Sequence, residues 1–292
     1  DEITLALGYR PPYQWEHILN FLALRAIPRV ETVKEGKYYR TVHFLNGEKH
    51  IYSWIQAENQ PEKNTIAVTM PAELLPVLSQ VLAKVRNLFD LSCDPYAVYE
   101  GLMKMNNIQP NICTLGIRVP GCFDPFEMSV RAVLGQQITI KAAKTLAARI
   151  TEKFGVTIET GIEGLTHIFP EPEDVYKLKD KITDSLGELG IIKTRAKTIL
   201  ELASAFVNKE IDFNFCIHPE EEIKKLMKIS GIGNWTAQYI AMRAMGWTDA
   251  FLETDYGVKK ALPSYTPKEI LTLAEAWRPW RSYAVVNLWN SL

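Results

Sequence analysis

The hydrophobic positions of the first ninety residues follow two different periods. Segments with apolar side chains three or four residues apart predict helices, and segments rich in β-branched and aromatic residues predict strands. The predicted helices are residues 15–26 and 71–89, and the predicted strands are residues 38–44, 50–55 and 66–70. Asn46-Gly47 lies between the first two strands and is a strong signal for a tight hairpin turn. A small antiparallel sheet with helices packed on it is therefore expected at the N-terminus.

After Cys93 the pattern becomes helical, and Gly or Pro separates most of the periodic segments. The predicted helices are residues 126–154, 173–178, 193–208, 220–228, 235–246, 267–277 and 281–289. The expected fold class is α+β, with a small N-terminal sheet domain followed by a mostly helical core. We place the boundary near residue 92.

Composition narrows the class of protein. The chain has 292 residues, a net charge of -1 and 47% hydrophobic residues, which is typical of a soluble protein with a large core and at least two domains. Near-neutral charge excludes a polycationic nucleic-acid coat but permits a local basic face. No apolar run is long enough for a membrane span, and no secretory signal is visible. The four cysteines form no C-x-x-C pair, so we expect reduced thiols in a cytoplasmic protein.

The turn Gly231-Ile232-Gly233 is the first candidate functional element. One predicted helix ends before it and another begins directly after it. Glycines let the backbone approach a ligand closely, and the free N–H groups at the start of a helix attract an anion. A helix–hairpin–helix of this kind holds a nucleic-acid phosphate without reading the base sequence. An ordinary helical hairpin with Gly at its C-cap would give the same local pattern.

Asp255 is the candidate catalytic residue. It follows the apolar run Ala250-Phe251-Leu252, in a region crowded with aromatic residues. These aromatic residues are Trp235, Tyr239, Trp247, Tyr256, Trp277, Trp280, Tyr283 and Trp289. An aromatic pocket with one carboxylate suits a flat and cationic guest. The alternative is that the tryptophans are core residues and Asp255 is only a helix N-cap.

Several motifs, in order along the chain, resemble those of the helix–hairpin–helix DNA glycosylases, and in particular their 3-methyladenine DNA glycosylase II (AlkA-like) branch. The motifs are Pro11-Pro12-Tyr13-x-Trp15, Leu88-Phe89-Asp90-Leu91, Pro120-Gly121-Cys122-x-Asp124-x-Phe126-Glu127, Arg131-Ala132-x-Leu134-Gly135-Gln136, Gly231-Ile232-Gly233-x-Trp235-Thr236-Ala237 and Trp277-x-Pro279-Trp280-Arg281-Ser282-Tyr283-Ala284. The resemblance covers nearly the whole chain.

The resemblance implies three parts with a base pocket between the two helical ones. These are an N-terminal domain (residues 1–92), a helical subdomain carrying the catalytic aspartate (93–119 plus 248–292), and a helical subdomain with the hairpin (120–247). It implies Asp255 as the catalytic residue. The implied pocket residues are Phe21, Trp235, Tyr239, Tyr256 and Trp289. The implied DNA-binding residues are Gln136, Gln137, Gly231 and Gly233.

Two further features are implied only by the resemblance. The backbone carbonyls of Met227, Ile229 and Ile232 would hold a structural Na⁺ or K⁺ that bridges to a DNA phosphate. Gln137 stands where the branch has its duplex-wedging residue, which is typically Leu.

Two missing features, a cysteine cluster and a lysine nucleophile, predict the type of reaction. No four-cysteine cluster follows the hairpin, so no iron–sulfur cluster is expected, and no cofactor is required. Trp235 occupies the position of the lysine nucleophile of bifunctional relatives. The expected enzyme is therefore a monofunctional, monomeric glycosylase that flips alkylated bases such as 3-methyladenine out of double-stranded DNA and hydrolyses them away, leaving an abasic site.

Two other functions remain open from the sequence. One is a related glycosylase for oxidised or mismatched bases, and the other is a non-catalytic helix–hairpin–helix DNA-binding protein. Metal chemistry is not expected, because the histidines show no metal-ligand spacing with Cys or carboxylates. The histidines are His17, His43, His50, His167 and His218.

Overall fold

The N-terminal strands form one antiparallel sheet in the order β1-β5-β4-β3-β2. The computed structural model describes residues 1–214 and 216–292. The strands are β1 (Glu2–Gly8), β2 (Glu31–Lys34), β3 (Lys37–Asn46), β4 (Lys49–Gln60) and β5 (Thr65–Pro71). The predicted hairpin is confirmed: Asn46 pairs with Lys49. Gly47 has φ +63°, a value that the tight turn requires and that Gly adopts without strain.

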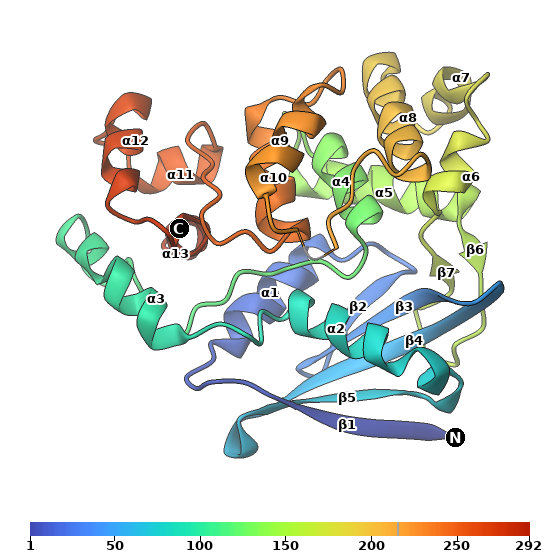
Figure 1. Ribbon diagram of the computed structural model, residues 1–292, viewed down its shortest axis with the longest axis horizontal. Coiled ribbons are helices and arrows are strands. Elements are labelled where there is room, and N and C mark those ends of the chain that lie inside the picture. Colours follow the sequence, from blue (N-terminus) through green and yellow to red (C-terminus); the bar gives the residue numbers. More distant parts are fainter. Residues whose placement is uncertain (215) are drawn as a thin grey trace.

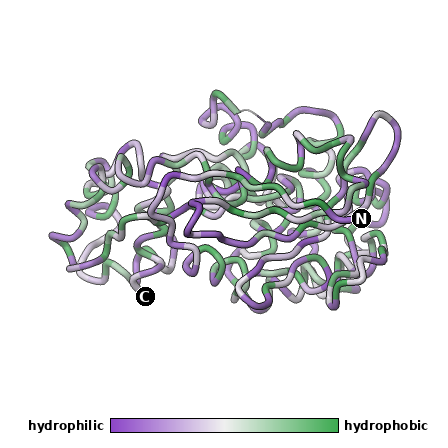
Figure 2. The backbone as a smooth tube through the Cα atoms, turned by 90° about the horizontal axis from the view of Figure 1, so that it is seen from below, coloured by the Kyte–Doolittle hydropathy of each residue, from purple (hydrophilic) through white to green (hydrophobic). Residues whose placement is uncertain are grey.

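Two helices cover one face of this sheet. They are α1 (Trp15–Arg25) and α2 (Leu78–Leu88), and both contribute to one core with buried strand residues such as Tyr38, Ile55 and Val68. Along the strands, hydrophobic and hydrophilic positions alternate, as Figure 2 shows from the sheet side. The predicted helix 71–89 begins instead with a 3₁₀ turn, Ala72–Val77, since Pro76 cannot donate a helical hydrogen bond.

The helical part lies above the sheet in Figure 1. Its helices are α3 (Pro95–Leu102), α4 (Pro125–Leu134), α5 (Ile140–Phe154), α6 (Pro172–Tyr176), α7 (Ile182–Gly187), α8 (Lys193–Val207), α9 (Pro219–Met227), α10 (Asn234–Ala244), α11 (Tyr256–Ala261), α12 (Pro267–Glu275) and α13 (Arg281–Asn290). Two short strands, β6 (Val156–Thr157) and β7 (His167–Ile168), pair with each other. The predicted α+β class is confirmed, with a sheet followed by a helical core.

The single helix predicted over 126–154 is wrong, because two helices occupy this range. The helix is interrupted between α4 and α5, where Gln137 adopts a left-handed φ of +55°. Thr139 then caps α5 by accepting a hydrogen bond from the Ala142 N–H. The short loop between the two helices lines the cleft described below, and the interruption of the helix therefore places loop residues at that site.

The segment after residue 92 packs on the C-terminal helix. The Thr114 N–H donates to Asn287 Oδ1 on α13 at 3.0 Å. Gly101 on α3 lies so close to Trp280 that a Cβ there would come within 2.5 Å of the indole. These contacts are consistent with a subdomain of residues 93–119 and 248–292, and the three-part division stays a prediction.

A buried ion network joins the sheet to the helical part. Arg40 on β3 contacts Glu127 on α4 at 2.6 Å, and Arg131 contacts both Glu31 and Glu127, at 2.9 and 3.0 Å. Burial alone would raise the pKa of Glu31, but the charges of Arg131 and Arg40 lower it well below its usual value. Arg131 also donates to the Arg25 carbonyl at the end of α1, so the network fixes that helix end.

The four cysteines are free thiols. Cys93, Cys113 and Cys122 are buried and free, and burial raises the pKa of each thiol. Cys216 is half-buried and also free.

Among the described residues, no helix has the length and apolar character needed to cross a membrane.

Candidate DNA-binding and base-binding site

The glycine turn connects α9 to α10, and its two glycines are required for different reasons. Gly231 has φ +90°, and a Cβ there would lie 2.2 Å from Thr198 Oγ1. No atom lies within 4 Å of the Cβ position of exposed Gly233, which directly precedes α10. Gly231 therefore lets the turn pack on α8, whereas Gly233 leaves open space in front of a helix N-terminus, as binding of a phosphate requires.

Gln136 and α8 hold this turn in place. The Gln136 amide donates to the Gly231 carbonyl and to Thr236 Oγ1, both at 2.9 Å. Arg195 on α8 donates to the Gln136 carbonyl, and Thr198 Oγ1 donates to the Ser230 carbonyl at 2.7 Å. The Gln136 side chain, predicted to touch DNA, is thus already engaged with the hairpin.

The three carbonyls predicted to hold a monovalent cation lie around the same turn. The Ile229 carbonyl accepts a hydrogen bond from the Ile232 N–H at 3.1 Å, which leaves it one lone pair. In the described chain, no turn, loop or side-chain hydrogen bond is directed at the carbonyls of Met227 and Ile232. These oxygen donors fit a hard cation.

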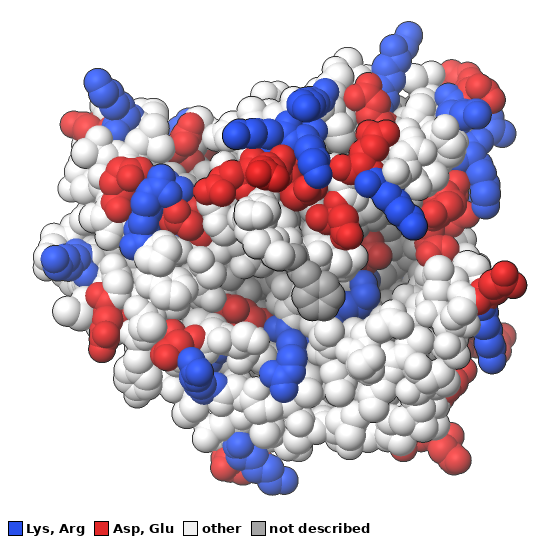
Figure 3. Space-filling view, viewed as in Figure 1, with Lys and Arg blue, Asp and Glu red and all other residues white. Residues whose placement is uncertain are grey.

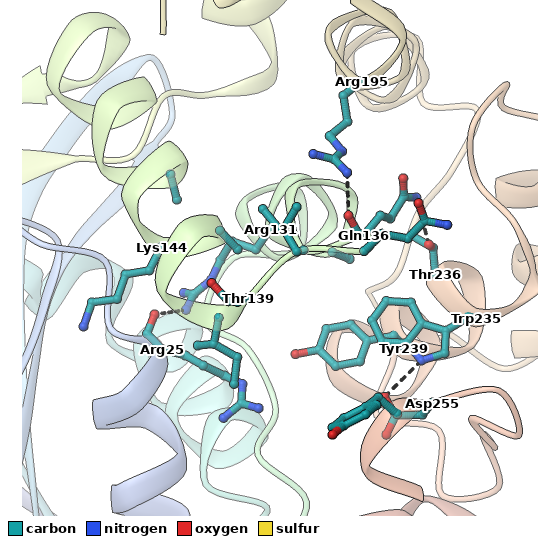
Figure 4. A pocket seen from close by; sticks show the side chains of 18 of the residues that line it. Arg25, Arg131, Gln136, Thr139, Lys144, Arg195, Trp235, Thr236, Tyr239 and Asp255 are labelled. Carbon is teal, nitrogen blue, oxygen red and sulfur yellow. Dashed lines mark hydrogen bonds between the residues drawn. The ribbon is translucent and has the colours of Figure 1, made fainter. Parts of the chain in front are cut away.

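Asp255 sits at the N-cap of α11, and its carboxylate is held from three sides. Oδ1 accepts from the Val258 N–H at 3.0 Å and from Trp289 Nε1 at 2.8 Å. Oδ2 accepts from Trp235 Nε1 at 3.2 Å. Asp255 is therefore a helix N-cap, as the alternative interpretation expected. The two indole contacts also place its carboxylate at the aromatic cluster (Figure 4).

Four of the five predicted pocket aromatics form a continuous wall. Trp235 stacks on Tyr239 with ring centroids 5.2 Å apart, and Phe21 stacks on Trp289 at 5.9 Å. Tyr239 and Trp289 join the two pairs at 6.5 Å. All four side chains are half-buried, and three of them, Trp235, Tyr239 and Trp289, line the cleft, whereas Phe21 stands behind Trp289.

Tyr256 does not join this wall. Its side chain is 79% exposed at the edge of the cleft, one residue after Asp255. Tyr256 is the first residue of α11 and directly follows the N-cap Asp255. Its side chain points outward, whereas the carboxylate of Asp255 points inward. In this structure Tyr256 borders the mouth of the cleft and does not contact the stacked rings.

The cleft that contains these residues has a volume of about 1320 Å³ and opens between α1, α4, α5, α8, α10 and α11. Gln137, Gly233 and Asp255 all line it, so the turn, the α4–α5 loop and the carboxylate face one space. Gln137 is exposed there and keeps a left-handed backbone, which is uncommon for a non-glycine residue and typical of functional loops.

Three cationic side chains that were not among the predicted site residues also line the cleft, namely Arg25, Arg243 and Lys144. Arg25 lies 3.7 Å above the Phe21 ring, and Arg243 donates to the Tyr239 hydroxyl at 3.0 Å. Burial alone would raise the pKa of Tyr239, but the charges of Arg243 and Arg25 outweigh it and lower the pKa below its usual value. Lys144 lies across the cleft from Asp255 (Figure 4).

Charge on the face seen in Figure 3 is mixed. Basic and acidic side chains lie next to one another there, and neither sign forms a continuous surface. This agrees with the near-neutral composition. On this face an anionic partner would therefore meet individual charged groups and not a continuous basic surface.

The sequence matches two protein-family models. Residues 4–124 match the AlkA N-terminal domain, and residues 130–266 match the HhH-GPD superfamily base excision DNA repair protein. A DNA-3-methyladenine glycosylase 2 from Escherichia coli (strain K12) is 36% identical over 283 residues, which is 97% of this chain and 95% of the relative.

Solved structures have the same fold. A 3-methyladenine DNA glycosylase from Archaeoglobus fulgidus superposes with a TM-score of 0.77 and 22% identity, over 98% of this chain and 97% of the other. An 8-oxoguanine glycosylase/lyase from Clostridium acetobutylicum, bound to double-stranded DNA, has a TM-score of 0.67 and 19% identity, over 96% and 91%. Because identity to the E. coli relative extends along nearly its whole length, the chain belongs to the helix–hairpin–helix (HhH-GPD) DNA glycosylases of the DNA-3-methyladenine glycosylase 2 type, N-glycosyl hydrolases that remove alkylated bases from DNA.

Proposed function

We propose that this chain works as a monomer on double-stranded DNA, flips an alkylated base such as 3-methyladenine into its cleft, and leaves an intact strand with an abasic site. The observation that carries the proposal is the Asp255 carboxylate, held by the indole N–H groups of Trp235 and Trp289 beside the stacked rings. A carboxylate next to an aromatic wall is what release of a cationic base requires.

The stacked rings select the base. Alkylation of a ring nitrogen makes the base positively charged, and a cation over an aromatic face is attracted by the ring electrons. Trp235, Tyr239 and Trp289 line the cleft and offer such faces, and a flipped base in the cleft would lie among them. The charge of Arg131 is balanced by Glu31 and Glu127, whereas Arg25 and Arg243 lie over the Phe21 ring at 3.7 and 4.9 Å.

Asp255 supplies the catalytic charge. As the N-glycosidic bond breaks, its electrons leave with the base and the sugar becomes oxocarbenium-like. The Asp255 carboxylate stabilises this positive charge, and its fixed position means that little reorganisation is needed during the reaction. Water then adds to the sugar carbon and loses a proton, which completes a hydrolysis without a covalent enzyme intermediate.

The absence of a suitable amine supports the monofunctional reaction. The position of the lysine nucleophile carries Trp235, whose indole N–H donates to Asp255. Among the described residues that line the cleft, Lys144 is the only lysine, and it lies across the cleft from Asp255. A Schiff base would need an amine at the sugar carbon that Asp255 faces.

DNA would be held by the hairpin and opened by the α4–α5 loop. The space at Gly233 admits a phosphate, and a Na⁺ or K⁺ on the carbonyls of Met227, Ile229 and Ile232 would add positive charge beside it. The exposed Gln137 would enter the gap that the flipped base leaves, where its amide can bond to the orphaned partner base. Gln136 would act by fixing the turn.

The test is a base-release assay on three duplexes, carrying an alkylated base, 8-oxoguanine or a mismatch. Fast release from the alkylated duplex alone, with strand breakage only after alkali or heat, is the expected result. Preferential release of 8-oxoguanine or a mismatched base would favour a related glycosylase. Binding without release from any duplex would favour a non-catalytic DNA-binding protein. Size-exclusion chromatography with light scattering tests the monomer.

A further inference from the structure

Two histidines and a glutamate meet on the far side of the sheet from its core, outside the cleft. In the β3–β4 ladder His43 pairs with Tyr52 and Leu45 pairs with His50, so His43 and His50 share one face. Glu171 is the N-cap of α6 and comes from the helical part. The spacing of these residues along the sequence did not indicate this group. Strand pairing and docking of a distant segment bring these three residues together.

The contact between the two parts is specific. Thr41, on the same face of β3, donates to the His167 carbonyl on β7 at 2.7 Å, which fixes the segment leading to Glu171. His43 Nδ1 then lies 2.7 Å from Glu171 Oε1, and His43 Nε2 lies 2.9 Å from His50 Nδ1. One ligand atom from each residue lies within 4.8 Å of the others. The Tyr52 hydroxyl is 3.4 Å from His50 Nδ1.

We propose that His43, His50 and Glu171 form a binding site for a divalent transition-metal ion, with Zn²⁺ as the physiological occupant. Neutral imidazole and carboxylate are ligands that Zn²⁺ accepts, and two imidazoles with one carboxylate are an established zinc donor set. On a tetrahedral ion with bonds of 2.0–2.1 Å, neighbouring ligand atoms are about 3.3 Å apart. Nδ1 and Nε2 of His43 cannot bind the same ion, so only one of the two short distances joins a pair of ligand atoms, and the third donor lies within 4.8 Å of that pair. Rotation of the exposed His50 side chain would bring the three donors to the separation that the ion needs.

Burial and charge fit an ion that enters from solvent. The His43 side chain is 11% exposed and that of Glu171 33%, so both are held in place, while exposed His50 stands at the open side. The Glu171 carboxylate provides negative charge for the ion, and water completes the coordination. The bound ion would link the β3–β4 hairpin to the start of α6, so it would tie the sheet to the helical part.

The experiment uses the full chain without a histidine tag, stripped with a chelator. Titration with ZnCl₂ in a calorimeter should give one tight site. His50→Gln and Glu171→Gln should each abolish tight binding, because each removes a ligand. His17→Gln is the matched control and should bind like the parent, because His17 is exposed on α1 and lies outside the cluster. CoCl₂ should give the intense visible absorption of a tetrahedral ion in the parent and in His17→Gln only.

A second measurement separates the site from adventitious binding. Zn²⁺ should raise the unfolding temperature of the parent and of His17→Gln, and should leave that of His50→Gln unchanged. Base release should be the same in all variants, because the cluster lies outside the cleft. Zinc binding that survives in both His50→Gln and Glu171→Gln, or no binding by the parent, would overturn the proposal and leave a plain hydrogen-bonded cluster.

Discussion

Replacing Asp255 by Asn removes one negative charge and little else. The amide oxygen of Asn can still accept from the Val258 N–H and from Trp289 Nε1, so α11 keeps its N-cap. The amide nitrogen then faces Trp235 Nε1, which loses its acceptor. That loss affects stability by about 1–3 kcal/mol and does not abolish folding.

The size of the kinetic effect follows from the position of the carboxylate. Asp255 is half-buried at the edge of an open cleft and accepts three hydrogen bonds, so an effective dielectric constant near 20 is appropriate. At a separation of about 4 Å, the carboxylate then stabilises the sugar cation by about 4 kcal/mol. Because each 1.36 kcal/mol is a factor of ten in rate, Asp255→Asn should slow base release about a thousandfold.

The assay is single-turnover release of an alkylated base from a duplex, with enzyme in excess. Affinity for a duplex with an abasic-site analogue, measured in parallel, should change little because phosphate contacts dominate it. Asp124→Asn is the matched control: Asp124 is also a half-buried N-cap, accepts from the Glu127 N–H at 2.6 Å, and does not line the cleft. It should release the base at the parent rate.

A folded Asp255→Asn protein that releases the base within about tenfold of the parent rate would refute the reasoning, since the charge would then contribute under 1.4 kcal/mol. Equal losses in Asp255→Asn and Asp124→Asn would also refute it. That outcome would mean that weakened helix capping, and not the charge, causes the defect.

Three further predictions follow from the structure. Gln137→Ala should weaken binding to an abasic-site duplex more than to single strands, because only a duplex has a gap to fill; equal losses in fluorescence anisotropy would assign the wedge elsewhere. Borohydride added during turnover should trap no protein–DNA adduct; an adduct that disappears in Lys144→Gln would move the chain to the lyases. Burial raises the pKa of Asp90 from 3.8 to about 6, so the folded chain keeps a proton that the unfolded chain has lost, and stability falls as pH rises through this window. In urea unfolding between pH 3.8 and about 6, the free energy of unfolding of Asp90→Asn should fall by about 3 kcal/mol less than that of the parent. An equal fall in both proteins would contradict the assignment.

Local chemistry made much of the fold predictable. Asn46-Gly47 specified its hairpin because only a positive φ closes that turn, and Gly231-Ile232-Gly233 specified the start of α10. The edge strands β1 and β2 were not predicted, since their existence depends on pairing with distant strands. The break at Gln137 was also missed, although Gly135, the C-cap of α4, and Thr139, the N-cap of α5, stand on either side of it.

The candidate site was predictable only in part from the residues themselves. The spacing of Trp235, Tyr239 and Asp255 suggested a pocket, but Phe21 was placed there by the family resemblance alone, because it comes from the far end of the chain. Neither route predicted that Arg25 and Lys144 line the cleft. Their position depends on how α1 and α5 dock, which no local pattern records.

The ion network of Glu31, Arg40, Glu127 and Arg131 makes the two parts of the chain interdependent during folding. Each part brings one pair of opposite charges, Glu31 with Arg40 and Glu127 with Arg131, and the contacts of Arg40 with Glu127 and of Arg131 with Glu31 form only when the parts dock. The same docking fixes the end of α1 through the Arg25 carbonyl, and with it the position of Phe21 against Trp289. Loss of the charge of Glu31, Arg40 or Glu127 would therefore disturb the cleft from a distance, without a change in any residue that lines it.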